Sequence, residues 1–355
     1  MYPAITVLEA LGPEKHTLLW VGGHEGMEEN LVSRLGIPYT SIPAAGVHGV
    51  GLRQLPGNIL KLIKGFFKSR QILRSFNPDA LLFTGGYIAF PMAVAAIRKP
   101  SLLYVPDIEP GLAIKALARF SDQIALTTAE SAAYFPNKSK LTVTGYPVRP
   151  ELKKWTRSKA LDYFNFDPAL PTLTVTGGSK GARSINTALI KILPTLLDEM
   201  QVIHLTGHLD WDIVDAQTKH LPEDQAKRYQ AFPYLHEMGA AFAAADLIIS
   251  RAGASSLGEL PQFGLPAILV PYPYAWRYQQ INAEYLADLG AAMILNDEDL
   301  ETNLYAQIHS LITDRESLSR MSQAMTSVAT PDAAQRIAGL IQEMVGEPKG
   351  GGSAW

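Results

Sequence analysis

The amino-acid sequence predicts an α/β protein made of two domains, each a doubly wound sheet of mostly parallel strands. The chain has 355 residues, enough for two α/β domains of about 150 residues each. It is 47% hydrophobic and 18% charged, which is typical of a globular protein. Short apolar runs also alternate with longer amphipathic segments along the chain, as expected of repeated βα units.

The predicted strands follow one another in a regular order. The first part of the chain contains the runs TLLWVGG, ALLFTGG, SLLYVPD, QIALTTA and LTVTG, and the second part contains PTLTVTGGS, QVIHLTG, LIISRAG and PAILVPYP. Each run is short and rich in apolar residues, which indicates a buried strand. A polar, charged segment after LTVTG predicts a boundary at Val148, so the domains are expected to comprise residues 1–148 and 149–345.

The two ends of the chain depart from this rhythm. The opening MYPAITVLEAL has apolar residues at helical spacing behind Pro3, so it predicts a helix with no strand before it. Residues 346–355 end in GGGSAW and resemble a flexible linker followed by the remnant of an affinity tag.

Composition excludes several functions. No apolar run approaches the roughly 18 residues of a transmembrane helix and no segment resembles a secretory signal, so a cytoplasmic protein is expected. The absence of Cys removes disulfides, thiolate metal sites and a Cys nucleophile. The net charge of −3 gives no general attraction to nucleic acid. No cluster of metal ligands is apparent, so neither a metal nor a cofactor is expected.

A glycine-rich turn follows the first predicted strand of the second domain, which lies in the run PTLTVTGGS. Gly177, Gly178, Ser179 and Gly181 lead into a helix that carries Asn186 in its opening turns. Glycines let the backbone approach a ligand, and free N–H groups at a helix start favour phosphate. The pattern lacks the Gly-Lys-Ser/Thr ending of a Walker sequence. An ordinary strand-to-helix turn is the alternative.

A second turn of this kind follows the strand LIIS. Arg251, Gly253 and Ala254 lie in the turn, and Glu259 lies on the helix behind it. A carboxylate there can accept two hydrogen bonds from the vicinal hydroxyls of a ribose. A solvated helix position is the alternative for Glu259.

Two amide side chains follow on a predicted helix. Gln279 and Asn282 are three residues apart, so one helix face can offer both amides to a polar ligand. Ordinary surface residues are the alternative.

An amphipathic basic segment occupies residues 57–70. It interleaves cations with apolar side chains, including Ile63, Lys64, Phe66, Phe67 and Lys68. Such segments bind anionic bilayer surfaces. The alternative is a core-packing helix with a solvated basic face, but two adjacent Phe residues are hard to bury on one narrow stripe, which favours membrane contact.

The motifs, taken in order, resemble those of the MurG family. The resemblance is carried by TGGYIAFP, TGYPVRPEL, TGGSKGARSIN, FPYLHEMGAAFAAADLIISRAG, GLPAILVP and YQQINA, which extend over nearly the whole chain without the tag. It implies a GT-B fold, in which two Rossmann-like domains face a cleft. It also implies an inverting transfer of GlcNAc from UDP-GlcNAc to the C4 hydroxyl of the MurNAc of lipid I, which gives lipid II for peptidoglycan synthesis.

The resemblance also implies partners and site residues. The partners are UDP-GlcNAc, an undecaprenyl-linked lipid acceptor and the inner face of the bacterial cell membrane, where the protein would bind peripherally. The N-terminal domain would take the acceptor and the C-terminal domain the donor. The implied donor residues are the diphosphate loop around Ser179, Arg149, the backbone of Leu235, the ribose-binding Glu259, and the sugar-binding Gln279 and Asn282. The implied acceptor loop is Gly85, Gly86 and Tyr87.

Three departures from the family pattern bear on the acceptor and the donor. The usual His-Glu-Gln-Asn is replaced by a segment that contains Asp107 and Glu109, either of which is a candidate general base. Tyr278 and Trp276 replace residues near Gln279 that bear on donor choice. The family's first strand and glycine loop precede the stretch that matches MYPAI, so an incomplete acceptor site is expected.

Alternative functions remain at this point. The altered acceptor segment also fits transfer of a sugar to another lipid, such as a diacylglycerol. The missing loop fits a catalytically impaired protein that still binds UDP-GlcNAc. A UDP-GlcNAc 2-epimerase shares the architecture but does not need the basic, Phe-rich segment.

Overall fold

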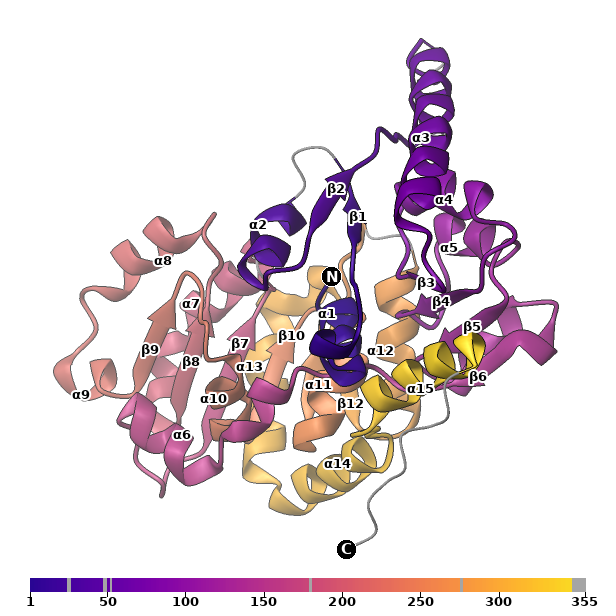
Figure 1. Ribbon diagram of the computed structural model, residues 1–355. Coiled ribbons are helices and arrows are strands. Elements are labelled where there is room, and N and C mark those ends of the chain that lie inside the picture. Colours follow the sequence, from indigo (N-terminus) through magenta and orange to yellow (C-terminus); the bar gives the residue numbers. More distant parts are fainter. Residues whose placement is uncertain (24–26, 47–49, 52, 179–180, 275–276, 347–355) are drawn as a thin grey trace, which may run out of the picture. The chain divides into compact units, whose positions relative to one another are not determined.

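The computed structural model describes residues 1–23, 27–46, 50–51, 53–178, 181–274 and 277–346. The chain forms two compact units, and it crosses from the first to the second at Val148 (Figure 1). The second unit is Val148–Pro331, and the chain from Asp332 onward belongs to the first unit with Met1–Pro147. The expected domain 149–345 is therefore corrected at its end, because helix α15 (Ala333–Val345) packs against α1 (Tyr2–Leu11) and β4 (Ser101–Val105).

The first unit contains two parallel sheets. One pairs β1 (Trp20–Gly22) with β2 (Tyr39–Ser41), and the other has the order β3-β4-β5-β6. The strands of the second sheet are β3 (Leu81–Phe83), β4 (Ser101–Val105), β5 (Gln123–Leu126) and β6 (Leu141–Val143). The helices are α1, α2 (Met27–Arg34), α3 (Leu55–Phe76), α4 (Ala89–Ala95), α5 (Leu112–Leu117) and α15. Side chains from both sheets share one apolar interior, which includes Val21 of β1 and Phe83 of β3.

The opening segment forms the predicted helix. Pro3 lies in the first turn of α1, where a missing N–H costs no hydrogen bond. Ile5, Val7 and Leu11 are buried along the helix. Gly12 ends it in the left-handed conformation that favours glycine.

The second unit is built on one six-stranded parallel sheet. Its order is β12-β11-β10-β7-β8-β9. The strands are β7 (Thr172–Thr176), β8 (Gln201–Leu205), β9 (Tyr229–Phe232), β10 (Leu247–Ser250), β11 (Ala267–Leu269) and β12 (Ala292–Ile294). The helices are α6 (Arg157–Phe164), α7 (Arg183–Glu199), α8 (Trp211–Thr218), α9 (Glu223–Ala226), α10 (Met238–Ala244), α11 (Ser256–Phe263), α12 (Tyr278–Asp288), α13 (Leu300–Thr313) and α14 (Arg315–Ser327).

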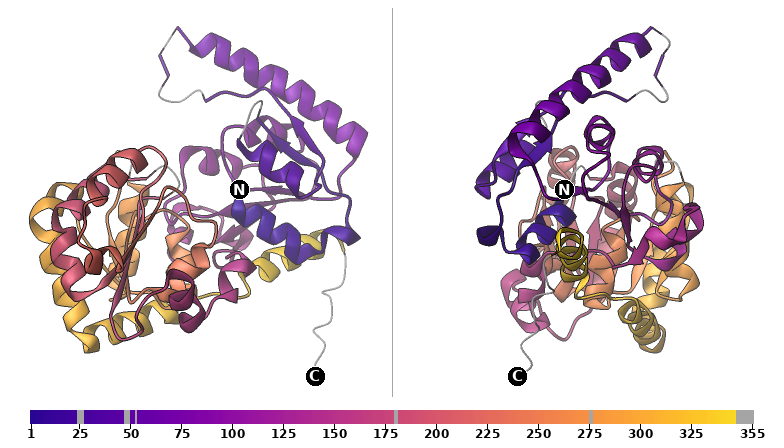
Figure 2. Two further views of the ribbon diagram at one scale, coloured as in Figure 1. Left: turned by 90° about the vertical axis from the view of Figure 1, so that its left-hand side faces the viewer. Right: turned by 45° about the vertical axis from the view of Figure 1, so that its right-hand side comes forward.

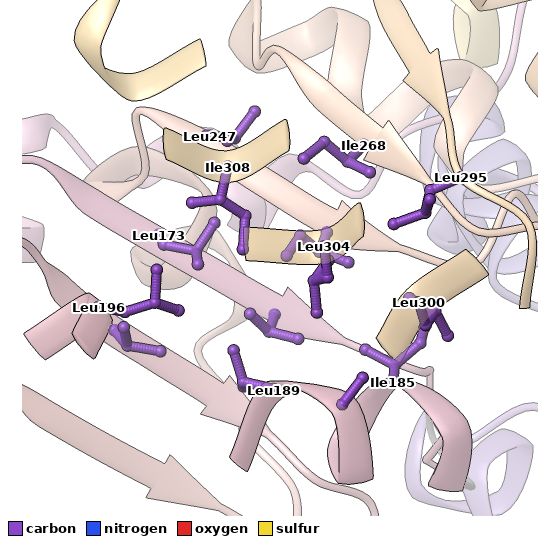
Figure 3. Packing of buried hydrophobic residues seen from close by; sticks show 14 of the residues in the cluster. Leu173, Ile185, Leu189, Leu196, Leu247, Ile268, Leu295, Leu300, Leu304 and Ile308 are labelled. Carbon is purple, nitrogen blue, oxygen red and sulfur yellow. The ribbon is translucent and has the colours of Figure 1, made fainter. Parts of the chain in front are cut away.

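The core of the second unit lies between its sheet and helices α7 and α13. Ile185 and Leu189 of α7 are one helical turn apart and pack toward Leu173 of β7 (Figure 3). Leu304 and Ile308 of α13 repeat this spacing over the same core (Figure 3). These side chains are 0 or 1% exposed, so each helix is held by burial of one apolar stripe.

All nine predicted strand runs contain a strand, and every pairing in the described parts of the chain is parallel. The sequence prediction missed β2, β9 and β12. Their sequences are YTS, YQAF and AMI, and all three lie at sheet edges. Edge strands need less apolar surface than central ones, so they give a weaker signal.

Candidate active site

The order of the second sheet locates a candidate binding site. The chain winds from β7 through β8 to β9 and then returns to β10 on the other side of β7. In open parallel sheets, ligands bind beyond the carboxyl ends of the strands at such a reversal. Thr176 and Ser250 end these two neighbouring strands and are partners in the register. The two predicted glycine-containing turns therefore start side by side.

Two glycines of the turn after β7, Gly177 and Gly181, have no room for a side chain. A Cβ atom on Gly177 would lie 2.2 Å from the backbone nitrogen of Ala182, and one on Gly181 would lie 2.2 Å from the carbonyl oxygen of Thr206. Gly178 and Gly181 also have φ angles of +84° and +81°, which L-residues rarely adopt. The Gly181 N–H donates to the Gly178 carbonyl over 2.9 Å. The predicted Ser179 lies outside the described residues.

Asn186, predicted to serve the donor site, bonds to protein groups within the second unit. Its side chain is buried, and its amide nitrogen donates to the Thr206 carbonyl over 2.9 Å and to Oδ2 of Asp210 over 3.0 Å. Its amide oxygen bonds Nε2 of His204 over 3.0 Å. The residue lies one turn inside α7, so the helix points it at β8 and not at the turn.

Arg183 and Asp210 form an ion pair at the start of α7 that no sequence pattern singled out. Arg183 is the first residue of the helix, and its side chain is 71% exposed. Its Nε and Nη2 atoms lie 2.8 and 2.7 Å from Oδ1 of Asp210, whose side chain is only 6% exposed. In the sequence, Arg183 ends the segment GGSKGAR, so its position next to the glycine-rich turn could have identified it as a site residue.

Arg251 likewise has a structural use. Its Nη1 lies 2.5 Å from Oδ1 of Asp297 and 3.2 Å from the carbonyl of Val270, and its Nη2 donates to Ser184 over 2.9 Å. The guanidinium also stacks on the ring of Tyr272 at 5.3 Å. It therefore connects the ends of β10 and β11 to α7, and a role of Arg251 in donor binding stays a prediction.

The turn after β10, which contains Gly253 and Ala254, has open space beside Gly253. A Cβ atom on Gly253 would meet no atom within 4 Å. Its carbonyl accepts from the backbone N–H and the hydroxyl of Ser256, the first residue of α11. The turn is thus fixed by hydrogen bonds and leaves space above the glycine.

Arg149 and Glu259 are brought together although 110 positions separate them. Nη2 of Arg149 lies 3.7 Å from Oε1 of Glu259, and the two side chains are 23 and 18% exposed. Burial raises the pKa of Glu259, and the positive charge of Arg149 and a hydrogen bond from Ser255 oppose this effect. The carboxyl group therefore takes up a proton more readily than an ordinary Glu does.

Only one of the two predicted amides on α12 is accessible. Gln279 is partly exposed, and its amide oxygen accepts from the backbone N–H of Tyr272 over 2.9 Å. Asn282 is fully buried and donates to the carbonyl of Ala252 over 3.1 Å. This hydrogen bond connects α12 to the turn after β10, and the predicted contact of Asn282 with a sugar stays a prediction. Trp276 lies outside the described residues.

Leu235 lies in the loop between β9 and α10. Its side chain is 5% exposed and packs into an apolar cluster with Phe164 and Ala240. Within the described residues, its backbone N–H and carbonyl make no hydrogen bond. The predicted use of this backbone by a ligand stays a prediction.

The first unit has its predicted turn after β3. Gly85 and Gly86 have φ angles of +106° and +81°, and a Cβ atom on Gly85 would lie 2.7 Å from Ile114. Tyr87 follows with 50% of its surface exposed. The turn is thus a second place where glycine is required.

Asp107 and Glu109 follow β4 at the carboxyl end of the same sheet. Glu109 is 3.5 Å from Nζ of Lys115. Asp107 lies near the fully buried Tyr104, whose hydroxyl is 2.8 Å from that of Thr127. Burial raises the pKa of Tyr104, and charge interactions with Tyr146 and Asp107 add to the effect, whereas the hydrogen bond with Thr127 opposes it.

Helix α3 exposes an apolar stripe. Ile59, Ile63 and Phe67 recur every four residues and are 45, 49 and 65% exposed. Lys64 and Lys68 lie beside them with exposed side chains. Phe66 is half-buried, and the guanidinium of Arg70 lies 5.9 Å from its ring. Figure 2 shows α3 as one long helix, and no described helix is long and apolar enough to cross a membrane.

In the described part of the chain, no three His, Cys, Asp or Glu side chains are grouped so that they could hold a metal ion.

Comparisons with known proteins identify the family to which the two domains belong. Residues 1–126 match the glycosyltransferase family 28 N-terminal domain, and residues 172–337 match the family's C-terminal domain. The chain thus has the GT-B fold of a two-domain glycosyltransferase.

The relatives define the family more closely. A UDP-N-acetylglucosamine--N-acetylmuramyl-(pentapeptide) pyrophosphoryl-undecaprenol N-acetylglucosamine transferase of Roseiflexus sp. (strain RS-1) is 36% identical over 97% of this chain and 92% of its own. The transferase of the same name from Desulfitobacterium hafniense (strain DSM 10664 / DCB-2) is 37% identical over 95 and 94%. The crystal structure of Acinetobacter baumannii MurG matches with a TM-score of 0.76 and 26% identity over 96 and 95%. This chain belongs to the MurG family.

The geometry of the glycine turn predicts unequal tolerance of two substitutions. Gly181→Ala places a methyl group against the Thr206 carbonyl at a positive φ, so we expect it to lower the free energy of unfolding by at least about 2 kcal/mol. Gly253→Ala meets no neighbour and should cost less than about 1 kcal/mol. Urea denaturation of both variants measures the difference, and equal losses would contradict the close approach at Gly181.

Proposed function

We propose that this protein transfers GlcNAc from UDP-GlcNAc to the C4 hydroxyl of the MurNAc of lipid I and so forms lipid II. The family membership supports this reaction. The single geometric observation that carries it is the partly buried pair Arg149 and Glu259, in the same unit as the two turns at the sheet reversal. Such a site combines a carboxylate for ribose hydroxyls with backbone donors and a cation for a diphosphate.

Different residues of the second unit would bind the diphosphate, the ribose, the uracil and the sugar of UDP-GlcNAc. The N–H groups of the turn Gly177–Gly181 and the start of α7 would hold the diphosphate, with Arg149 as a cation. Glu259 would accept hydrogen bonds from the ribose, and the backbone of Leu235 would pair with uracil. Gln279 would use its amide nitrogen on the sugar, since its oxygen already accepts from Tyr272. Transition-state charge on the leaving UDP would then be stabilised by fixed dipoles.

The acceptor would bind the first unit at the turn Gly85, Gly86 and Tyr87 and at the end of β4. A general base there must take the proton of the attacking hydroxyl. Asp107 and Glu109 are the two candidates for this base, and Glu109 also lies 3.5 Å from Nζ of Lys115. We test Asp107, which directly follows the end of β4 and its neighbouring Pro106.

The protein would act at the inner face of the cell membrane. The stripe Ile59, Ile63 and Phe67 has the apolar surface that inserts among lipids, and Lys64 and Lys68 have the charge that attracts anionic headgroups. The undecaprenyl chain of the acceptor would then stay in the bilayer while its sugar reaches the first unit.

Release of UDP tests the function. The full chain should release UDP from UDP-GlcNAc when lipid I is added and should not do so with diacylglycerol. Asp107→Asn should lower kcat by at least about a hundredfold if Asp107 is the base, with Asp79→Asn as the control. Release with diacylglycerol alone would favour transfer to another lipid, and UDP-GlcNAc binding with no turnover on either acceptor would favour an impaired enzyme.

Donor binding should depend on pH through Glu259. Its raised pKa means that the carboxylate is lost at a higher pH than the ordinary value of 4.5 predicts. Protonation removes an acceptor for the ribose and the charge opposite Arg149. We therefore expect the Kd for UDP, measured by calorimetry, to rise as the pH falls toward this pKa.

Two variants control this measurement. Glu259→Gln should bind UDP more weakly at neutral pH and lose the dependence on pH. Glu301→Gln alters an exposed ion pair with Lys191 and should leave the profile unchanged. An unchanged profile in Glu259→Gln would contradict the assignment.

Membrane binding should depend on the exposed stripe of α3. The double variant Ile63→Ser with Phe67→Ser should reduce sedimentation with anionic liposomes by about tenfold or more, because two apolar anchors are lost. Ile97 is 63% exposed outside α3, so Ile97→Ser is the matched control and should bind as the original chain does. Equal binding by all three would refute the membrane role of α3.

A further inference from the structure

A chain of buried hydrogen bonds links β9 and β8 to the glycine turn. The Tyr229 hydroxyl lies 2.8 Å from Nδ1 of His204, and Nε2 of His204 lies 3.0 Å from the amide oxygen of Asn186. Asn186 donates to Thr206 and Asp210, and Asp210 accepts from Arg183. His204 is 0% exposed, so this network lies inside the unit.

The partners fix the direction of every bond. Both contacts of the Asn186 nitrogen are acceptors, a carbonyl and a carboxylate, so its oxygen must face His204 as an acceptor. Nε2 of His204 therefore carries the hydrogen. Burial lowers the pKa of His204 to about 3, so the ring is neutral and its Nδ1 accepts from Tyr229. Burial also raises the pKa of Tyr229, which keeps that hydroxyl a donor.

The network ends at two groups next to the glycine-rich turn after β7, which is the proposed diphosphate site. One is the Thr206 carbonyl, which is held by Asn186 and lies where a Cβ atom of Gly181 would be. The other is Asp210, which holds the exposed Arg183 beside the turn. A cation at a helix N-terminus is repelled by the helix dipole, so Arg183 needs this buried carboxylate to stay in place.

We propose that His204 is a positioning residue for donor binding: it orients the Asn186 amide, and through it the Thr206 carbonyl and the Asp210–Arg183 pair, so that the glycine turn is set for a diphosphate. The proposal rests on the proposed function, in which this turn holds UDP. His204 itself touches no substrate.

Two amide substitutions separate this role from general stability. The Nε2 atom of a Gln side chain can occupy the place of the His Nε2 atom, so His204→Gln keeps a donor for Asn186. Asn reaches only as far as the His Nδ1 position, so His204→Asn leaves the Asn186 oxygen unsatisfied. Both variants bury one amide in the same site and should lower the melting temperature to a similar extent.

Calorimetry of the full chain with UDP is the measurement. We expect His204→Asn to raise the Kd by about tenfold, the size of effect that a broken buried network produces, and His204→Gln to stay within about threefold of the original chain. In turnover with lipid I, His204→Asn should raise the KM for UDP-GlcNAc and leave the KM for lipid I unchanged. Equal Kd values for the two variants would overturn the proposal.

A variant at the other end of the network keeps the proposal testable if the His204 variants do not fold. Asp210→Asn removes the carboxylate that Arg183 needs, and it lies near the surface turn before α8. It should raise the Kd for UDP as His204→Asn does, and the double variant should lose no more than the worse single variant, because both act through one network. Additive losses, or unchanged binding in Asp210→Asn, would overturn the proposal.

A control on the same strand separates local from global effects. Gln201 is buried at the opposite end of β8 and bonds to Asp167, so Gln201→Leu should lower the melting temperature without changing the Kd. If the original chain itself binds no UDP, the proposed function fails. If the original chain binds UDP and the His204 variants bind equally well, only the positioning role fails.

Discussion

The second unit depends on a backbone contact that leaves no space for side chains. At the end of β7 the chain turns so tightly that Gly177 touches the nitrogen of Ala182, and Gly181 touches the carbonyl of Thr206 beyond β8. This closeness places the first turn of α7 just beyond the carboxyl end of β7, a central strand of the sheet. Any larger residue at either glycine would push α7 away from β8, and the apolar stripe of α7 would then lose its packing on the sheet.

Polar side chains around this turn divide into those that hold the protein and those that remain available. Asn186, Asn282 and Arg251 are buried or nearly so, and their donors are used on backbone carbonyls and carboxylates. Buried polar groups must be satisfied, and a group that is already satisfied by the protein gains little by binding a ligand. Among the groups that are accessible to solvent are the side chain of Arg183, which is 71% exposed although it pairs with Asp210, and the partly exposed Gln279.

The same division explains how far the sequence could predict the site. Apolar runs located the strands, and glycines located the turns, because both are local signals. Gln279 and Asn282 share a helix face by spacing, but spacing does not say which of two neighbouring positions faces the core, and the packing of α12 on the turn after β10 turned Asn282 inward. The pairing of Arg149 with Glu259 and the docking of α15 on α1 arise from contacts between distant segments, for which a single sequence holds no local signal.

Electrostatics gives a reason for keeping donor and acceptor residues in separate units. A diphosphate needs cations and backbone donors, and an unpaired carboxylate nearby would repel it. Two carboxylates near the glycine turn, Asp210 and Asp297, are each paired with an arginine, so they add no net negative charge. A general base, in contrast, must keep a carboxylate that can accept a proton. In the proposed function, Asp107 at the end of β4 in the first unit would be this group.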